Sequence, residues 1–333
     1  MVCLGKQAAR KLKPSKGEYE GVAYEKDKAT KRLTDEEYIV QFQNALNQAK
    51  TTVDELNAKK KEVPKCPNRG DFEEYEDYRE ASLAYMKEVN EAIDYNVELD
   101  KLIIQANANA LALPETERAS LSIEWRTKKI DESREWNASK LTATKERGNF
   151  ALSELNKLVS KNVQPDEMKN VKFYVTKQRS CYKNEKHKNG NAVYINARCH
   201  NSSVFAHEVM HWLENNNKTI GEKAAAFLLR RAESDSRLVK VGSDGCEFAY
   251  KDTFEEKGTI DYAGKIYFEG LTKASRLGDF KNFSSLTRSE KASKINATEI
   301  LSCGIERVLT DSARFAKEDP EYFAFTIRTL RGE

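Results

Sequence analysis

Two histidines four residues apart give this chain its clearest chemical signal. They lie in His207-Glu208-Val209-Met210-His211, and the whole chain of 333 residues has only 4 histidines. On a helix, residues four apart lie on the same face. Both imidazoles can therefore bind one Zn²⁺ ion, and the glutamate beside the first histidine can contact a water molecule there. The alternative is an amphipathic helix that carries two ordinary histidines.

The residues around this motif predict a helix over Ser203 to Glu214. Polar residues 201–203 offer oxygen atoms that can cap its start, and no Pro or Gly interrupts it. Three asparagines at 215–217 predict its end. Its apolar side chains, which include Phe205 and Trp212, can bury the helix among its neighbours.

A catalytic zinc site needs a third protein ligand, and four residues compete for this position. His200 precedes the predicted helix start, and His187 lies in a charged loop. Glu299 is preferred because Ile300 and Leu301 follow it, and a carboxylate among apolar residues needs a charged partner. Glu306, seven residues on, shares its helical face and remains the main competitor. For both glutamates the ordinary alternative is an exposed surface position.

These residues predict a hydrolytic mechanism. Zn²⁺ lowers the pKa of a nearby water towards about 7, and Glu208 is positioned to accept its proton as general base. Tyr262 or Tyr267 can supply a phenol to the developing oxyanion, although a packed aromatic is the alternative for each. Ser302 is a candidate for orienting a histidine. Glu214 is interpreted as a charge at the helix end.

Composition restricts the class of protein. Hydrophobic residues make up 39% and charged residues 33%, with a net charge of +3. Acids and bases are interleaved, which gives no indication of nucleic-acid binding. No apolar run reaches the length of a membrane span, and the N-terminus lacks the apolar core of a secretory signal. The six cysteines are scattered without a Cys-x-x-Cys pair, which favours reduced thiols in the cytoplasm. A disulfide between Cys181 and Cys199 is a minor alternative.

The first half of the chain is predicted to be helical. Residues 1–30 are expected to form a flexible tail, and residues 31–165 a coiled-coil-like helical region. Thr34 and Glu37 form a capping box before a helix that reaches residue 56. Further helices are predicted over 75–112 and 115–161, the latter with Trp125 and Trp136 on one face. Such a region is expected to pack on itself, on partner copies in a homo-oligomer, or on an assembly partner.

The second half, residues 166–333, is predicted to be an α+β domain with a small sheet and the histidine helix. Strands are expected over 171–176, 191–196, 248–250 and 262–267. Val193-Tyr194-Ile195 is the candidate free edge for an extended substrate. Helices are expected over 221–239, 296–309 and from Asp319 onwards, where Pro320 occupies a favourable first-turn position.

Residues 170–333 resemble the zincin-like metallopeptidase domain of some phage head-morphogenesis and minor-head proteins. The resemblance is carried by Val193-Tyr194-Ile195-Asn196, His207-Glu208-x-x-His211-Trp212-Leu213-Glu214, Tyr262-Ala263-Gly264-Lys265-Ile266-Tyr267, Thr298-Glu299-Ile300-Leu301-Ser302 and Asp319-Pro320-Glu321-Tyr322-Phe323.

This resemblance implies a gluzincin-type HExxH site. In such a site His207, His211 and Glu299 bind zinc and Glu208 is the general base. The chain departs from the family at Met210, where Gly is common, and at Cys303, four residues after the expected third ligand.

The sequence therefore predicts a zinc-dependent metallopeptidase that acts on a protein or peptide, and the resemblance implies association with a phage particle. Two alternatives stay open. In one, the zinc site is inactive and the protein acts through its helical arms. In the other, the enzyme is a zinc amidase that cleaves a cell-wall substrate.

Overall fold

The structure is a computed structural model of the 333-residue chain. It describes residues 33–126, 138–165, 170–183, 191–232, 238–241, 247–250, 262–268, 283 and 285–333. The expected tail at residues 1–30, His187 and Trp136 lie outside the described residues.

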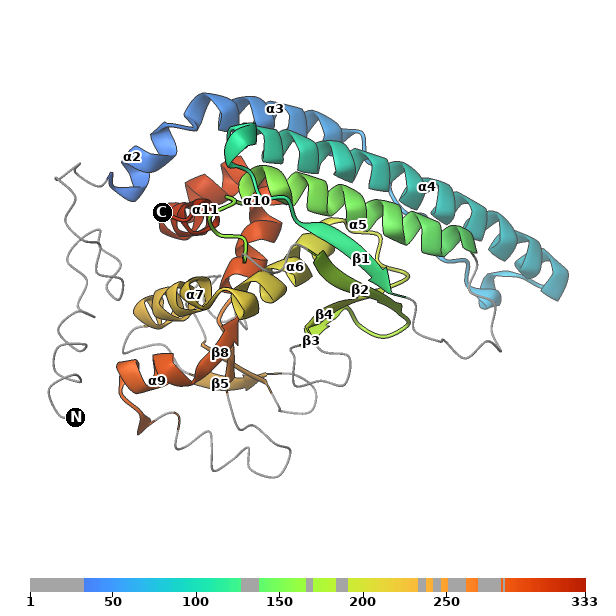
Figure 1. Cartoon of the computed structure of the whole chain (residues 1–333). Coiled ribbons are helices and arrows are strands. Elements are labelled where there is room, and N and C mark those ends of the chain that lie inside the picture. The colour runs from blue at the N-terminus through green and yellow to red at the C-terminus, as the bar shows by residue number, and fades with distance from the viewer. Residues whose placement is uncertain are drawn as a thin grey trace, which may run out of the picture.

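The described part of the chain is an α+β structure (Figure 1). Its α-helices are α2 (Asp35–Val40), α3 (Gln43–Ala58), α4 (Tyr75–Ala110), α5 (Ala138–Leu158), α6 (Ser203–Asn216), α7 (Lys218–Arg231), α9 (Arg288–Lys294), α10 (Ile300–Glu318) and α11 (Pro320–Arg331). Short 3-10 helices are η1 (Arg69–Asp71) and η2 (Glu115–Glu117). Its strands are β1 (Ser122–Arg126), β2 (Asn170–Thr176), β3 (Cys181–Lys183), β4 (Ala192–Asn196), β5 (Leu238–Val241), β6 (Glu247–Tyr250), β7 (Lys265–Phe268) and β8 (Ile295–Thr298).

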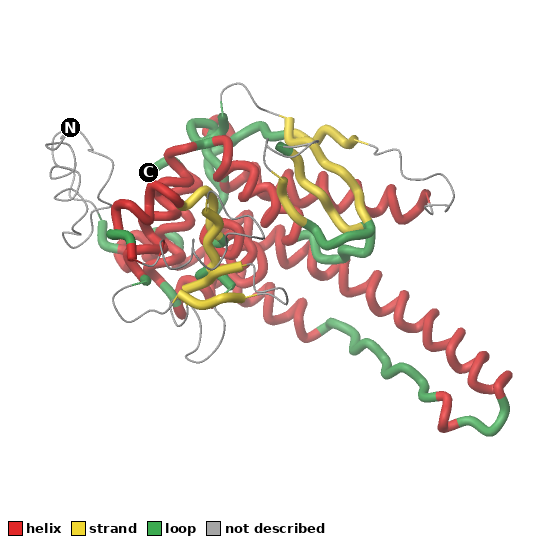
Figure 2. Tube along the Cα trace, turned by 90° about the horizontal axis from the view of Figure 1, so that it is seen from below, coloured by secondary structure: helices red, strands yellow, loops and turns green. Residues whose placement is uncertain are grey.

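Helices α3 and α4 pack against each other, and the N-terminal part of α4 extends away from the body of the molecule together with the loop that precedes it (Figure 2). The predicted capping box at Thr34 and Glu37 is confirmed at the start of α2. The predicted helix over 75–112 is confirmed as α4. Residues at three- and four-residue spacing on the two helices meet in a small apolar cluster of Val53, Leu56, Leu99 and Ile103.

The predicted helix over 115–161 is wrong in its first part. Residues Ser122–Arg126 form β1, which pairs in parallel with β2, and the α-helix among the described residues of this stretch is α5. Trp125 packs against Phe173 of β2, with 5.2 Å between the ring centroids. Few apolar residues recur at helical spacing along this stretch, because part of it is a strand that is stabilised by pairing with β2. Helical periodicity therefore gave the wrong prediction for it.

The first sheet has the strand order β1-β2-β4-β3. Strands β1, β2 and β4 run in parallel, and β3 joins β4 in the antiparallel direction. Alternate residues of β2, namely Val171, Phe173 and Val175, are buried, and helices α5 and α6 pack on this sheet. The prediction that β4 offers a free edge is wrong, because β4 lies between β2 and β3. Among the described strands, β3 is the edge strand on this side.

The second sheet is antiparallel, with the order β5-β6-β7-β8. The bounds predicted for two helices near it are wrong. Helix α7 ends at Arg231, before β5, and the stretch 296–298 belongs to strand β8 rather than to the helix that follows. The strand and helix α10 therefore meet at Glu299.

One hydrophobic core joins the two halves of the chain. It includes Tyr38 and Leu46 near the start and Leu330 near the end, and α10 packs on α3, α4 and α6. The boundary expected near residue 165 therefore does not separate two hydrophobic cores.

Asn107 of α4 makes a polar connection within this core. Helix α10 is kinked at Asp311, where the backbone leaves helical geometry. The Asn107 side chain donates to the Leu309 carbonyl at 3.1 Å and accepts from the Ser312 backbone N–H at 3.0 Å. It also accepts from the Ser312 hydroxyl at 2.7 Å. Asn107 thus satisfies the backbone groups beside the kink.

The cysteines and the helix compositions bear on two further expectations. Cys181 and Cys199 are free thiols, so the alternative disulfide is wrong. No described helix combines the length and apolar character that crossing a bilayer requires.

We predict that Asn107→Ala lowers the free energy of unfolding by about 2–4 kcal/mol, because buried backbone groups of α10 lose their partners. Asn109→Ala is the matched control, since Asn109 is exposed on the same helix and its side chain accepts a hydrogen bond from Lys157 at the surface. The control is expected to change stability by less than about 0.5 kcal/mol. Urea unfolding measures both, and equal small losses would contradict this role of Asn107.

Candidate metal centre

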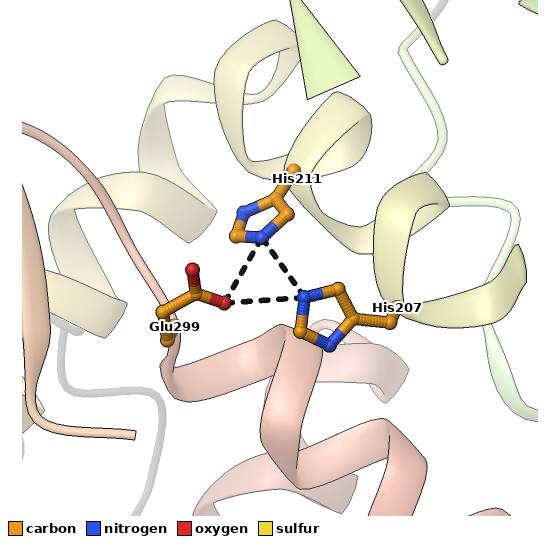
Figure 3. A group of neighbouring side chains, drawn as sticks. All are labelled: His207, His211 and Glu299. Atoms are coloured by element: carbon orange, nitrogen blue, oxygen red, sulfur yellow. Dashed lines mark hydrogen bonds and ion pairs between the residues drawn. The ribbon is translucent and has the colours of Figure 1, made fainter. Parts of the chain in front are cut away.

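Three potential metal ligands converge between α6 and the start of α10 (Figure 3). Glu299 Oε2 lies 3.2 Å from His207 Nε2 and 3.1 Å from His211 Nε2, and the two nitrogens are 3.3 Å apart. A tetrahedral zinc ion with bonds of about 2.0–2.1 Å separates its ligand atoms by about 3.3 Å. The three atoms therefore have the spacing of one face of such a tetrahedron.

Helix α6 places both histidines on one side by its regular geometry. Near its start, the Asn201 side chain accepts hydrogen bonds from the backbone N–H and the hydroxyl of Ser203, both at 2.9 Å. After the helix ends, Asn217 caps α7 by accepting from the Ile220 N–H. Phe205 and Trp212 are fully buried, so the helix is held on its apolar faces while the two imidazoles meet Glu299.

Glu299 owes its position to the junction between β8 and α10. It precedes the first turn of α10 and is 1% exposed. Tyr267 donates from its phenol to Oε1 at 2.5 Å, and Ser302 donates from its hydroxyl to Oε2 at 2.8 Å. These bonds fix both carboxylate oxygens. The prediction that Ser302 orients a histidine is wrong, because its hydroxyl bonds to Glu299.

Glu306 contacts His207 on the opposite side of the ring. Its Oε2 lies 3.2 Å from Nδ1 of His207, whereas Glu299 faces Nε2. A carboxylate on one ring nitrogen fixes the tautomer and directs the lone pair of the other nitrogen towards a metal. The structure therefore places Glu299 with the histidines and Glu306 behind His207, which separates the two competitors for the third position.

The electrostatics of the cluster favour a cation at its centre. Burial opposes the charged form of His207, but its hydrogen bonds to the carboxylates of Glu299 and Glu306 outweigh this effect and raise its pKa to about 10. Burial likewise opposes a charge on His211, yet the Glu299 carboxylate raises its pKa. Burial alone would raise the pKa of Glu299, but the two histidines hold it well below its usual range. A metal ion must displace protons here, so metal affinity falls as the pH is lowered.

Glu208 lines an open pocket beside this cluster. The pocket has a volume of about 440 Å³ and is lined by Arg179, Ser180, Asn196, Arg198, Cys199, Val204, His207, Glu208, Tyr262 and Glu306. Burial raises the pKa of Glu208, and the two histidines oppose the shift. The backbone of Tyr182 in edge strand β3 hydrogen-bonds to its carboxylate.

The two candidate tyrosines have different environments. Tyr262 lines the pocket, and its phenol oxygen accepts a hydrogen bond from Arg179 at 2.8 Å. Its ring centroid is 6.3 Å from that of His207. Tyr267, by contrast, donates its phenol proton to Glu299. Tyr262 is therefore the tyrosine that lines the open pocket.

Glu214 has a structural role that its sequence position did not predict. It is 2% exposed, and its Oε1 accepts from the backbone N–H of Thr298 at 3.0 Å and from the Thr298 hydroxyl at 2.9 Å. Since Thr298 precedes Glu299, this carboxyl ties the end of α6 to the third ligand. The interpretation of Glu214 as a helix-end charge is wrong. The sequence feature that could have indicated this role is the spacing of three residues between His211 and Glu214, which keeps Glu214 near the helix face that carries the histidines.

His200, the other histidine among the described residues, is exposed and precedes α6. It takes no part in the cluster of His207, His211 and Glu299. Comparisons of the chain with family models, curated proteins and solved structures find no match.

We predict that Glu299→Ala removes stoichiometric Zn²⁺ from the purified protein, because one of three ligands is lost. Glu306→Ala is expected to keep the ligands but to weaken Zn²⁺ binding by about 10–100-fold, since His207 loses its outer partner. His200→Ala is the control and should bind as the wild type does. Elemental analysis and competition with a chelator measure these effects. Metal loss from Glu306→Ala alone would instead make Glu306 the third ligand and Glu299 the outer partner.

We predict that Glu214→Gln stabilises the metal-free protein at pH 8 by about 2–3 kcal/mol relative to wild type. Burial raises the pKa of Glu214 from 4.5 to about 7, and its Oε2 has no hydrogen-bond partner among the described groups. The folded state therefore binds the proton more tightly than the unfolded state. Protonation of this carboxyl therefore stabilises the folded state. The stabilisation is fully present below pH 4.5 and is lost as the pH rises through 7.

The amide of Gln stays neutral, so the two proteins should have similar stabilities near pH 4.5. Glu222→Gln, an exposed change on α7, is the control and should show no such pH dependence relative to wild type. Urea unfolding in the presence of a chelator gives the values. A constant difference between Glu214→Gln and wild type at all pH values would contradict the buried, neutral carboxyl.

Proposed function

We propose that this chain is a zinc-dependent metallopeptidase with a gluzincin-type site. The observation that carries the proposal is the convergence of His207, His211 and Glu299 next to a pocket that contains Glu208. Two imidazoles and one carboxylate are a donor set typical of catalytic zinc. Zinc bound there would act as a Lewis acid that makes a nearby water more acidic.

The number of ligands supports catalysis rather than a purely structural zinc site. Structural zinc sites are closed by four protein ligands, whereas catalytic sites keep one position for water or substrate. The cluster found among the described residues has three ligands, and His207 also lines the open pocket. This arrangement supports the peptidase over a zinc-binding protein that acts only through its helices.

The side chains of the pocket supply the remaining steps. Glu208 accepts the proton of the attacking water and delivers it to the leaving amine, a role that its raised pKa favours. The Tyr262 phenol donates a hydrogen bond to the carbonyl oxygen as negative charge develops on it. Arg179 donates to that phenol oxygen and so supports its acidity. Edge strand β3, rather than β4, is the backbone that pairs with an extended substrate.

The helical pair α3–α4 is the proposed surface for assembly with other proteins. Tyr75, Leu83 and Met86 of α4 expose 62%, 60% and 58% of their surfaces, far more than core residues do. The association with a phage particle and the coiled-coil character of this region stay predictions from the sequence.

We predict that Glu208→Gln keeps Zn²⁺ but reduces peptide hydrolysis by about 100-fold or more, because the general base is lost. Glu222→Gln, which changes an exposed glutamate on α7, should hydrolyse at the wild-type rate. Peptide libraries and peptidoglycan are tested side by side with elemental analysis. Full activity in Glu208→Gln would remove it as base, and products from peptidoglycan alone would favour the cell-wall amidase.

A further inference from the structure

Two arginines line the pocket beside the candidate metal centre. Arg179 follows β2 and Arg198 follows β4, and both line the pocket that also contains Glu208. Strands β2 and β4 are parallel neighbours, with Thr176 paired to Asn196 at their carboxyl ends. The two turns therefore leave the same end of the sheet, which brings two guanidinium groups to one pocket.

Asn196 ties these two turns together. Its backbone N–H donates to the Ser180 hydroxyl at 3.0 Å, and its side-chain amide donates to the Lys177 carbonyl at 3.4 Å. Its side-chain oxygen accepts from the Arg198 backbone N–H at 2.8 Å. The backbones that carry both arginines are thus fixed relative to each other, although both arginine residues are exposed.

The pocket lining carries two guanidinium groups, those of Arg179 and Arg198, and two carboxylates, those of Glu208 and Glu306. Glu306 is engaged with His207, and Arg179 donates to Tyr262. No residue in the described ranges forms an ion pair with Arg198. A planar guanidinium binds a carboxylate with two parallel hydrogen bonds.

We propose that this pocket selects substrates that present a carboxylate to Arg179 and Arg198, close to the bond that is cleaved. The carboxylate belongs either to an aspartate or glutamate side chain or to the free C-terminus of a peptide. This inference names the substrate class of the proposed metallopeptidase and rests on that function. Both arginines are specificity residues here, and neither is needed to bind the metal.

Binding to zinc-loaded Glu208→Gln protein tests the proposal without hydrolysis. The probes are synthetic alanine-based hexapeptides with a single Glu at each position in turn, each with a Gln twin, and each as C-terminal acid and amide. We expect one acid-bearing peptide to bind about tenfold more tightly than its neutral twin, with a smaller difference at high salt. The position of that acid, internal or terminal, identifies which carboxylate is recognised.

Substitution of the arginines then identifies the receptor of the carboxylate. In the same background, Arg198→Gln should remove most of the preference, and Arg198→Glu should disfavour acidic peptides. Lys177→Gln is the matched control, since it removes a positive charge from the same turn but Lys177 does not line the pocket. A preference that survives the double change of Arg179 and Arg198 to Gln would show a carboxylate bound to the metal and would overturn the proposal.

Equal binding of all acidic peptides and their twins would also overturn it. Hydrolysis of the same peptides by the wild-type protein reports separately on the proposed function. Acid-selective binding that depends on Arg198 but occurs without hydrolysis of any peptide would support the carboxylate site and contradict the peptidase. Hydrolysis with no preference for acidic peptides would support the peptidase and contradict the carboxylate site.

Discussion

The contact between Glu299 and the two histidine nitrogens is the constraint on which the rest of the centre depends. Three atoms that carry lone pairs lie within 3.3 Å of one another in a buried place. Such atoms repel one another unless protons or a cation lie between them. The protein fixes this arrangement from outside, through Tyr267 and Ser302 on Glu299 and through Glu306 on His207. The cluster is therefore held in an arrangement that could bind a metal ion.

Four glutamates take four separate roles within a small volume, because their surroundings differ. Glu299 faces two histidines and stays ionised, whereas burial raises the pKa of Glu214 to about 7 despite the opposing effect of His211. Glu208 faces the open pocket, and Glu306 faces the far side of an imidazole. Burial and the nearest charge, rather than residue type, decide which carboxyl can bind a metal and which can move a proton.

The helical half of the chain supports this centre from behind. Helix α10, which begins directly after Glu299, packs on α4 and α6, and Asn107 of α4 satisfies the backbone at its kink. Helix α4 and the candidate metal centre thus belong to the same packed core. The N-terminal part of α4 and the loop that precedes it extend away from it (Figure 2).

Local patterns in the sequence determined the elements whose geometry depends on near neighbours. The His-Glu-x-x-His spacing fixed which side chains share a face of α6, and the capping box at Thr34 and the periodicity of α4 fixed two helices. Only the tertiary structure decided which distant carboxylate faces the histidines. The sequence favoured Glu299 for its apolar neighbours and kept Glu306 as the main competitor, and the structure separates them because β8 ends at Thr298, where Glu214 holds it. Strand β1 and the inner position of β4 also depend on partners far along the chain, which no local periodicity specifies.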